Sequence, residues 1–257
     1  MSLTHPDQND LFVVVPFYNE EQWLPATLAS LAAQSDLAFT LVLVDNASTD
    51  RSSAIALDFA RAHPELAVDR IYEPQKGTGA ASDTGFRYAI ARGAKRIART
   101  DADCLPDRDW VRNVRRAFDE RRLEFVAGKI RPRRDESFTT WCDRLVLPFL
   151  IWVAEHYGRV AWRGPEFKYP YILAPGNNLA ITAELYLAAG GFPRTSIAER
   201  HEDGALSEMV RTMTTRAALC RDVIVYNSAR RVRAWGYLNT LRWYRNHGYQ
   251  PVQVDIR

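Results

Sequence analysis

The fold of this chain is decided by Arg96-Ile97-Ala98-Arg99-Thr100-Asp101-Ala102-Asp103, a short strand pattern that ends in two carboxylates one residue apart. Residues i and i+2 of an extended strand point to the same side, so Asp101 and Asp103 are predicted to face one way where the strand gives way to a loop. Adjacent carboxylates repel each other unless a cation or hydrogen-bond donors compensate. The pattern therefore indicates either a site for Mg²⁺ or Mn²⁺ carrying a substrate phosphate, or a solvated turn.

Three strand-helix units lead up to this segment, which is itself the fourth strand. Apolar runs predict buried strands at residues 11–16, 39–44, 67–72 and 96–100, and helical patterns follow the first three of them at 19–31, 47–62 and 77–92. Alternation of this length is typical of an α/β domain with a mostly parallel, Rossmann-like sheet flanked by helices.

Polar side chains follow every predicted strand at its carboxyl end. Parallel sheets bind their ligands outside this edge, so we expect these side chains to surround one ligand. They are Tyr18, Asn19 and Glu20 after the first strand, Asp45 and Asn46 after the second, Lys76 after the third, and Asp101 and Asp103 after the fourth.

The second part of the chain is less regular. We predict a helix at 107–120, a strand at 125–130, a long apolar helix at 137–157 and a strand at 217–226. The long helix has two interpretations: a core helix under the sheet, or an interfacial segment that rests on a membrane presenting a lipid-linked acceptor. Glu202 and Asp203 are predicted to lie at a helix start, where acids complement the helix dipole.

Composition sets the class of protein. The chain has 257 residues, of which 47% are hydrophobic and 25% charged, as in an ordinary globular domain, and its net charge is only +3. Arginine runs favour anionic substrates or an acidic membrane surface, with solvated helix faces as the alternative. No nucleic-acid-binding motif occurs, so nucleic acid is not an expected partner.

The localisation is predicted from the lack of a signal-peptide pattern and of a membrane-spanning run in the sequence. The three cysteines show no metal-ligand spacing, and the N-terminal residues lack the basic-then-apolar order of a signal peptide. No apolar run reaches the roughly 18 residues of a membrane span. We therefore expect a cytoplasmic protein, with peripheral contact to the inner face of the membrane as an option.

The glycine-rich segment Gly77-Thr78-Gly79-Ala80-Ala81-Ser82 follows a predicted strand and opens a helix, as a dinucleotide-binding fingerprint does. Its third fingerprint position is Ser82 instead of Gly or Ala. It also follows the third strand, whereas that fingerprint belongs after the first. A dehydrogenase is therefore not favoured, although a helix N-terminus near a phosphate suits either ligand.

In their order along the chain, four motifs resemble those of family 2 glycosyltransferases with the GT-A fold. They are Val13-Val14-Val15-Pro16-Phe17-Tyr18-Asn19-Glu20-Glu21, Val42-Leu43-Val44-Asp45-Asn46-Ala47-Ser48-Thr49-Asp50, the segment from Gly77 to Gly85, and Asp101-Ala102-Asp103. Ala174-Pro175-Gly176-Asn177 and the Glu202-Asp203 pair resemble later motifs of the same family.

The resemblance implies an inverting transfer of one sugar from a nucleotide diphosphate sugar (UDP, GDP or dTDP) to a hydroxyl acceptor, with Mg²⁺ or Mn²⁺ as cofactor. The acceptor would be a glycan, a lipid-linked molecule or a small molecule. Residues 1–105 would form a nucleotide-sugar-binding half, and residues 106–257 a smaller acceptor-binding half that carries the catalytic base and a C-terminal helix.

The resemblance also assigns residues to these roles. Donor binding would fall to Pro16, Tyr18, Glu20, Asp45, Lys76, Asp83, Asp101 and Ala102; metal binding to Asp103 with Asp101; and catalysis to Asp203 as base beside Glu202. Asn177 would lie near the acceptor. The aromatic residues Trp162 and Tyr171 are candidates for lining an acceptor groove.

Departures from the family pattern concern the donor. Asn46 stands where many members carry a second acid, and Ser82 and Asp83 stand where Arg and Asn are usual. Two other classes of function remain. A catalytically idle GT-A-like module would bind sugar or lipid, but it would not require Asp101, Asp103 and Asp203. A sugar nucleotidyltransferase would need a basic, glycine-rich loop after the first strand, where this chain has none.

Overall fold

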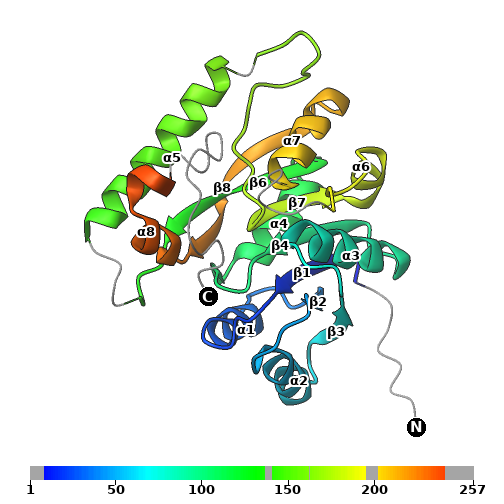
Figure 1. The fold of residues 1–257 in the computed structure, drawn as a ribbon. Helices are drawn as coiled ribbons and strands as arrows, with labels where there is room; N and C mark the ends of the chain where they lie inside the picture. The colour runs from blue at the N-terminus through cyan, green and yellow to red at the C-terminus, as the bar shows by residue number, and fades with distance from the viewer. Residues whose placement is uncertain (1–8, 137–140, 162, 195–201, 241–257) are drawn as a thin grey trace.

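The computed structural model describes residues 9–136, 141–161, 163–194 and 202–240 of the chain (Figure 1). Its strands are β1 (Leu11–Phe17), β2 (Thr40–Asp45), β3 (Ala67–Tyr72), β4 (Arg96–Thr100), β5 (Leu105–Pro106), β6 (Phe125–Pro132), β7 (Asn178–Thr182) and β8 (Ala217–Asn227). Its helices are α1 (Leu24–Ala32), α2 (Ser52–Ala62), α3 (Thr78–Ala91), α4 (Trp110–Asp119), α5 (Trp141–Ala161), α6 (Ala183–Ala188), α7 (Glu202–Met213) and α8 (Arg230–Trp235).

All of these strands belong to one sheet with the order β3-β2-β1-β4-β7-β6-β8-β5. The first four are parallel, as the alternation of strands and helices predicts, and Val14 of β1 pairs with both Val42 and Arg99. β7 inserts antiparallel between β4 and β6, and was not predicted as a strand. Its five residues are too few to reveal a strand period beside the preceding turn.

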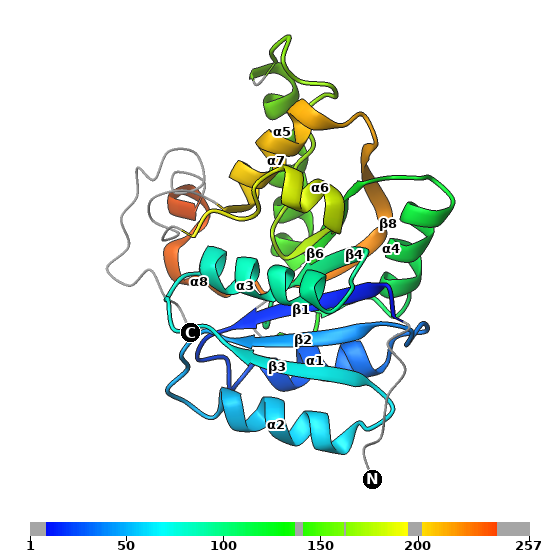
Figure 2. The same ribbon diagram turned by 90° about the vertical axis from the view of Figure 1, so that its right-hand side faces the viewer.

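The sheet is covered on both faces, because side chains of β1 alternate between two hydrophobic cores. Val13 and Val15 pack with α1 and α4, and Phe12 and Val14 pack with α3, α6 and α7. Figure 2 shows α2 below the parallel strands and α3, α6 and α7 above them. This three-layer arrangement confirms the predicted α/β class and leaves the carboxyl edge of the strands for loops.

Three helices begin later than the sequence predicts: α1 at Leu24 instead of 19, α2 at Ser52 instead of 47, and α4 at Trp110 instead of 107. α1 begins at Leu24 because Asn19 has a φ of 52° and the Glu20 N–H donates to Ser52 Oγ at 2.7 Å. α2 begins at Ser52 instead of in the segment 47–50, because Asp50 Oδ2 accepts the Glu21 N–H at 3.0 Å. These polar residues therefore join the loops that follow β1 and β2.

The long helix α5 does not lie in the core. It runs from 141 to 161 with Pro148 inside, and it exposes Leu145, Phe149, Trp152 and Val160 by 52–67%. Residues 137–140, which were included in the predicted helix, fall outside the described ranges. Within those ranges no helix has the length and apolar character needed to cross a membrane.

Candidate active site

Loops from three neighbouring strands meet at the carboxyl edge of the sheet. Lys76 Nζ donates to the Tyr18 hydroxyl at 2.8 Å and lies 4.4 Å from the centre of its ring. Asn46 Nδ2 donates to the Gln75 carbonyl at 2.7 Å, and its Oδ1 accepts the Gly77 N–H at 2.9 Å. The predicted convergence of Tyr18, Asn46 and Lys76 is confirmed.

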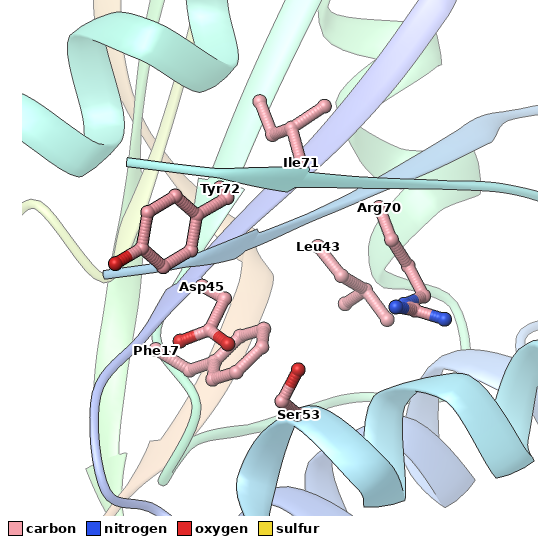
Figure 3. Close-up of a pocket in the computed structure, with 7 residues that line it drawn as sticks. All are labelled: Phe17, Leu43, Asp45, Ser53, Arg70, Ile71 and Tyr72. Carbon is pink, nitrogen blue, oxygen red and sulfur yellow. The ribbon is translucent and has the colours of Figure 1, made fainter. Parts of the chain in front are cut away.

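Asp45 lines a cavity of about 130 Å³ beside this edge. Its Oδ1 accepts the Ser48 N–H at 2.8 Å, which fixes the carboxylate at the end of β2. Pro16, in β1, pairs in register with Val44, so it lies one residue from the level of Asp45. Figure 3 shows the cavity with its lining residues Phe17, Leu43, Asp45, Ser53, Arg70, Ile71 and Tyr72.

The two central acids lie in a turn and not in the strand, because β4 ends at Thr100. Arg99, only 1% exposed, lies directly before them. Its Nε and Nη2 contact Asp101 Oδ1 at 3.1 and 3.0 Å, and its Nη1 donates to Glu202 Oε1 at 3.2 Å. A buried guanidinium thus connects the turn after β4 to the start of α7.

Charge is concentrated around Arg99. Burial raises the pKa of Asp101, and the nearby Asp103 and Glu202 raise it further, against the opposing effect of Arg99. Burial alone would lower the pKa of Arg99, but Asp101, Glu202 and Asp203 outweigh it and keep the guanidinium charged. The cluster therefore holds more acidic than basic groups, and an additional cation would stabilise it.

A second arginine binds the other acid of the turn. Arg230, the first residue of α8, donates to Glu20 through Nη1–Oε2 at 2.9 Å and Nη2–Oε1 at 2.6 Å. The same Nη2 lies 3.0 Å from Asp103 Oδ2. The Ala102 carbonyl between the two acids accepts the Thr27 hydroxyl at 2.7 Å, which fixes the turn against α1.

Asp203 lies in the first turn of α7, and its Oδ2 accepts the Gly176 N–H at 2.8 Å. A side chain on Gly176 would place Cβ 3.0 Å from the Arg99 guanidinium carbon, so a larger residue here would require the buried guanidinium to shift. Asn177 follows, and its Oδ1 is buried with no hydrogen-bond partner in the described part of the chain. Burial and the Asp203 charge raise the pKa of Tyr171 to about 12.

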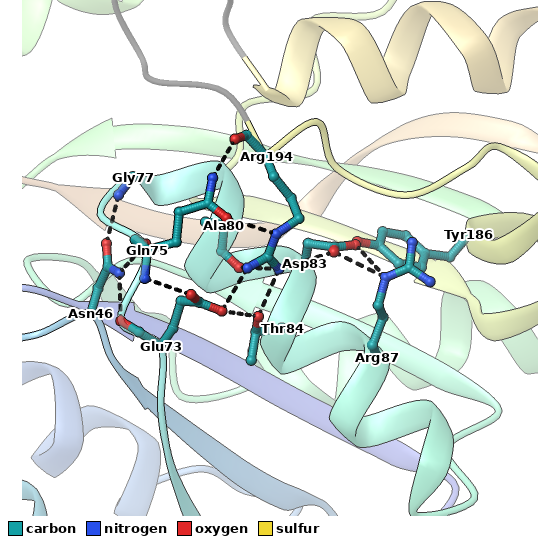
Figure 4. Close-up of polar contacts among 10 residues, drawn as sticks. All are labelled: Asn46, Glu73, Gln75, Gly77, Ala80, Asp83, Thr84, Arg87, Tyr186 and Arg194. Carbon is teal, nitrogen blue, oxygen red and sulfur yellow. Dashed lines mark hydrogen bonds and ion pairs between the residues drawn. The ribbon is translucent and has the colours of Figure 1, made fainter.

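Asp83 is engaged inside the protein. It accepts from Arg87 Nε at 2.9 Å, from the Tyr186 hydroxyl at 2.9 Å and from Arg194 Nη1 at 3.3 Å (Figure 4). These contacts join Asp83, which is part of α3, to Tyr186 of α6 and to the segment that follows α6. Its suggested role in donor binding stays a prediction. Trp162, a predicted acceptor residue, lies outside the described ranges.

Sequence reasoning missed the arginines that organise the acids. Arg99 had no assigned role, although a charged residue inside an apolar strand pattern is itself a signal that a buried partner exists. Arg133, 3% exposed, donates through Nη1 to the Asp103 carbonyl at 2.9 Å. Arg194 joins Glu73 to Asp83. Each contact crosses a long stretch of sequence or a turn that sequence periodicity does not describe.

The residues present fit a divalent cation whose coordination is completed by substrate. No group of three His, Cys, Asp or Glu side chains within the described ranges could hold a metal ion alone. Asp103 nevertheless offers carboxylate oxygens, the ligands that Mg²⁺ and Mn²⁺ prefer, and these ions usually take further oxygens from substrate phosphates. Asp103 Oδ1 contacts the weak donor Cys104 Sγ at 3.4 Å, so it can be shared with an ion.

Open α/β sheets generally bind ligands at the carboxyl edge of their parallel strands, which is where this sheet carries its linked acids. The chain belongs to glycosyl transferase family 2, whose family model matches residues 12–174.

Two relatives match the chain over part of their length. The chain is 36% identical over 142 residues to the undecaprenyl-phosphate 4-deoxy-4-formamido-L-arabinose transferase of Pseudomonas aeruginosa. The matched region covers 52% of this chain and 39% of the relative. The chain is 28% identical over 120 residues to the glycosyltransferase AglE of Haloferax volcanii, covering 46% and 38%. The chain therefore spans about two fifths of the length of these curated relatives.

Solved structures share the fold. Staphylococcus aureus TarS, residues 1–349 in complex with UDP, has a TM-score of 0.64 and 17% identity, covering 85% of this chain and 60% of that one. The mannosyltransferase PcManGT of Pyrobaculum calidifontis, in complex with GDP-Man and Mn²⁺, has a TM-score of 0.63 and 24% identity, covering 94% and 66%. These similarities confirm the predicted GT-A fold.

Proposed function

We propose that the protein is an inverting glycosyltransferase that moves one sugar from a nucleotide diphosphate sugar to a hydroxyl acceptor, with Mg²⁺ or Mn²⁺. The observation that supports this most directly is the linked set of acids at the carboxyl edge. Asp101 and Glu202 both accept hydrogen bonds from the buried Arg99. Asp203 accepts the N–H of Gly176, a residue that lies against the same guanidinium. Donor-side and acceptor-side acids thereby occupy one site.

The donor nucleotide would bind over the loops that follow β1, β2 and β3. Tyr18 with Lys76 offers an aromatic ring and a cation, and Asp45 offers a fixed carboxylate beside a cavity. These groups suit a base, a ribose and a diphosphate. Relatives in structure are described in complex with UDP, UDP-GlcNAc and GDP-Man, which supports a nucleotide sugar as the donor class.

In the proposed reaction Asp203 acts as the general base. Its carboxylate takes the proton of the acceptor hydroxyl while that oxygen attacks the anomeric carbon, and the bond from this carbon to the diphosphate oxygen breaks. A single displacement inverts the anomeric configuration. Glu202, bound to Arg99, would orient the surroundings of the base. A divalent ion held by Asp103, with Asp101 beside it, would neutralise the charge of the leaving diphosphate.

The acceptor would bind near Asn177 and Tyr171, where the buried Asn177 Oδ1 offers a hydrogen-bond acceptor. A lipid-linked acceptor and peripheral membrane contact are supported by the exposed apolar face of α5. Relatives by sequence are named as undecaprenyl-phosphate and dodecaprenyl-phosphate enzymes, which agrees with a lipid carrier. Binding of the protein to phospholipid vesicles tests this part of the proposal.

The first experiment is a thermal-unfolding series with UDP, GDP and dTDP, each with and without Mn²⁺. Saturation at about 100 times Kd should stabilise the fold by about 2.7 kcal/mol for the nucleotide that the site selects. The stabilisation should require Mn²⁺ and should be lost in Asp103→Ala. Equal stabilisation of Asp103→Ala would place the ion elsewhere, and no stabilisation by any nucleotide would favour an idle module.

A further inference from the structure

Arg230 occupies an unusual position for a residue so late in the chain. It lies 210 residues from Glu20, yet its two Nη atoms form a bidentate pair with that carboxylate. The same guanidinium reaches Asp103 Oδ2 at 3.0 Å. The side chains of Arg230, Glu20 and Asp103 are only 17%, 8% and 16% exposed, so solvent screens this three-membered cluster weakly.

The cluster is held from several sides. The Arg230 guanidinium carbon lies 5.6 Å from the centre of the Trp23 ring, and Arg133 lies 5.3 Å from the same ring. Arg133 also donates to the Asp103 carbonyl. The Ala229 N–H, one residue before Arg230, donates to the buried Glu136 at 3.1 Å. The backbone that carries Arg230 is therefore fixed by this contact, and the position of the guanidinium depends on its ion pairs.

A divalent ion on Asp103 would compete with Arg230 for the carboxylate, and most directly for Oδ2. A guanidinium hydrogen bond uses that Oδ2, and an ion there would lie within a few ångströms of a positive charge in a weakly screened place. Repulsion between like charges at such a distance is strong even at an intermediate dielectric. Metal binding to Asp103 is therefore disfavoured while the Arg230 guanidinium stays beside this carboxylate.

We propose that Arg230 is a competing internal cation of the metal site: it occupies Asp103 when no nucleotide is bound, and it yields Asp103 to the metal ion when an anionic diphosphate offers the guanidinium a new partner. The proposal rests on the proposed function for the assignment of Asp103 as metal ligand. It adds a coupling between metal binding and nucleotide binding. The metal ion alone binds weakly, and a nucleotide diphosphate strengthens metal binding because its phosphates pair with Arg230 in place of Asp103.

The test measures Mn²⁺ binding directly, from the electron paramagnetic resonance signal of free Mn²⁺, with no turnover involved. Arg230→Gln should bind Mn²⁺ at least about tenfold more tightly than the wild type when no nucleotide is present. Arg233→Gln is the matched control, since it removes the same charge from an exposed position of the same helix. It should bind Mn²⁺ as the wild type does. Asp103→Asn added to Arg230→Gln should abolish the gain.

A second arm measures the coupling. The nucleotide selected by thermal unfolding should tighten Mn²⁺ binding by a larger factor in the wild type than in Arg230→Gln. Arg230→Lys, which keeps the charge but cannot span both carboxylates with a fork, should give an intermediate affinity and serves as the test if Arg230→Gln does not fold.

The outcomes separate this proposal from the proposed function. If Arg230→Gln is folded and binds Mn²⁺ no more tightly than Arg233→Gln, Arg230 does not compete for the site, even where a metal-dependent nucleotide shift supports a transferase. If the Mn²⁺ gain appears but no nucleotide binds, the competition holds and the donor assignment fails. Absence of Mn²⁺ binding in every variant, with and without nucleotide, overturns both the metal assignment and the competition.

Discussion

Asp203 is positioned by backbone groups. Its Oδ2 accepts the Gly176 N–H at 2.8 Å and its Oδ1 accepts its own neighbour's N–H, that of Gly204, at 2.7 Å. Both contacts fix the carboxylate at the start of α7. The same carboxylate lies in a cluster with Arg99 and Glu202, and the buried guanidinium offsets part of the acidic charge.

Asp203→Asn should therefore separate binding from catalysis. The amide has nearly the same shape but cannot accept a proton, so we expect unchanged nucleotide binding and a loss of sugar transfer of about 10²–10⁴-fold. Transfer rates and nucleotide affinity are measured on the same samples, with Asp222→Asn, a substitution in β8, as control. Transfer near the wild-type rate would remove Asp203 as base, and a product with retained configuration would exclude the single displacement.

At the scale of elements, the segment between β3 and α3 is fixed by a polar network. Glu73 accepts from the Thr84 hydroxyl, from Arg194 Nη2 at 2.8 Å and from the Gln75 N–H at 2.7 Å (Figure 4). Burial would raise the pKa of Glu73, but the hydrogen bonds from Thr84 and Arg194 outweigh burial and lower it. This network connects the segment that carries Lys76 to the segment after α6.

The lowered pKa of Glu73 predicts a pH dependence of stability. A depressed carboxyl pKa contributes stability above the unfolded value of about 4.3, and this contribution is lost as the pH falls through the folded value. Glu73→Gln should lose about 1–2 kcal/mol of unfolding free energy at pH 7, with the difference shrinking below about pH 4. Urea unfolding at several pH values measures it. Glu120→Gln, at an exposed pair with Arg116, should show no such trend, and a constant difference for Glu73→Gln would refute the linkage.

At the scale of the whole molecule, the outer face of α5 is a surface of exposed apolar side chains. Leu145, Phe149, Trp152 and Val160 recur at helical spacing and are 62%, 59%, 52% and 67% exposed. The exposed side chain of Arg163 follows the helix, and its Nε donates to the Arg159 carbonyl at 2.7 Å. An apolar stripe with guanidinium groups at its C-terminal end matches the interface of an anionic bilayer.

Vesicle flotation should detect this contact. The wild type should bind vesicles containing phosphatidylglycerol more tightly than vesicles of phosphatidylcholine alone. Phe149→Ser with Trp152→Ser should weaken binding at least about tenfold, because each large apolar side chain contributes about 1.5–3 kcal/mol when buried. Leu187→Ser, a 50% exposed position on α6, should leave binding unchanged. Absence of wild-type binding, or a dimer that the double change dissociates, would show that α5 does not contact membrane.

Much of the fold was predictable from local pattern. The four parallel strands and the helix that begins at Glu202 follow from apolar runs and helix-start residues. The starts of α1 and α2 were wrong because their polar residues hydrogen-bond between two loops, and a sequence pattern does not distinguish such a bridge from a helix cap.

The sequence by itself determined most of the elements and the identity of the acids at the strand ends, because the periods of helix and strand and the chemistry of each side chain are local properties. Only the tertiary structure decided which charges meet. Arg99 reaches Glu202 across 103 residues and Arg230 reaches Glu20 across 210, after β7 has joined the parallel strands to β6 and β8. The physical reason is that ion pairing depends on distance through space, which the order of strands in the sheet sets.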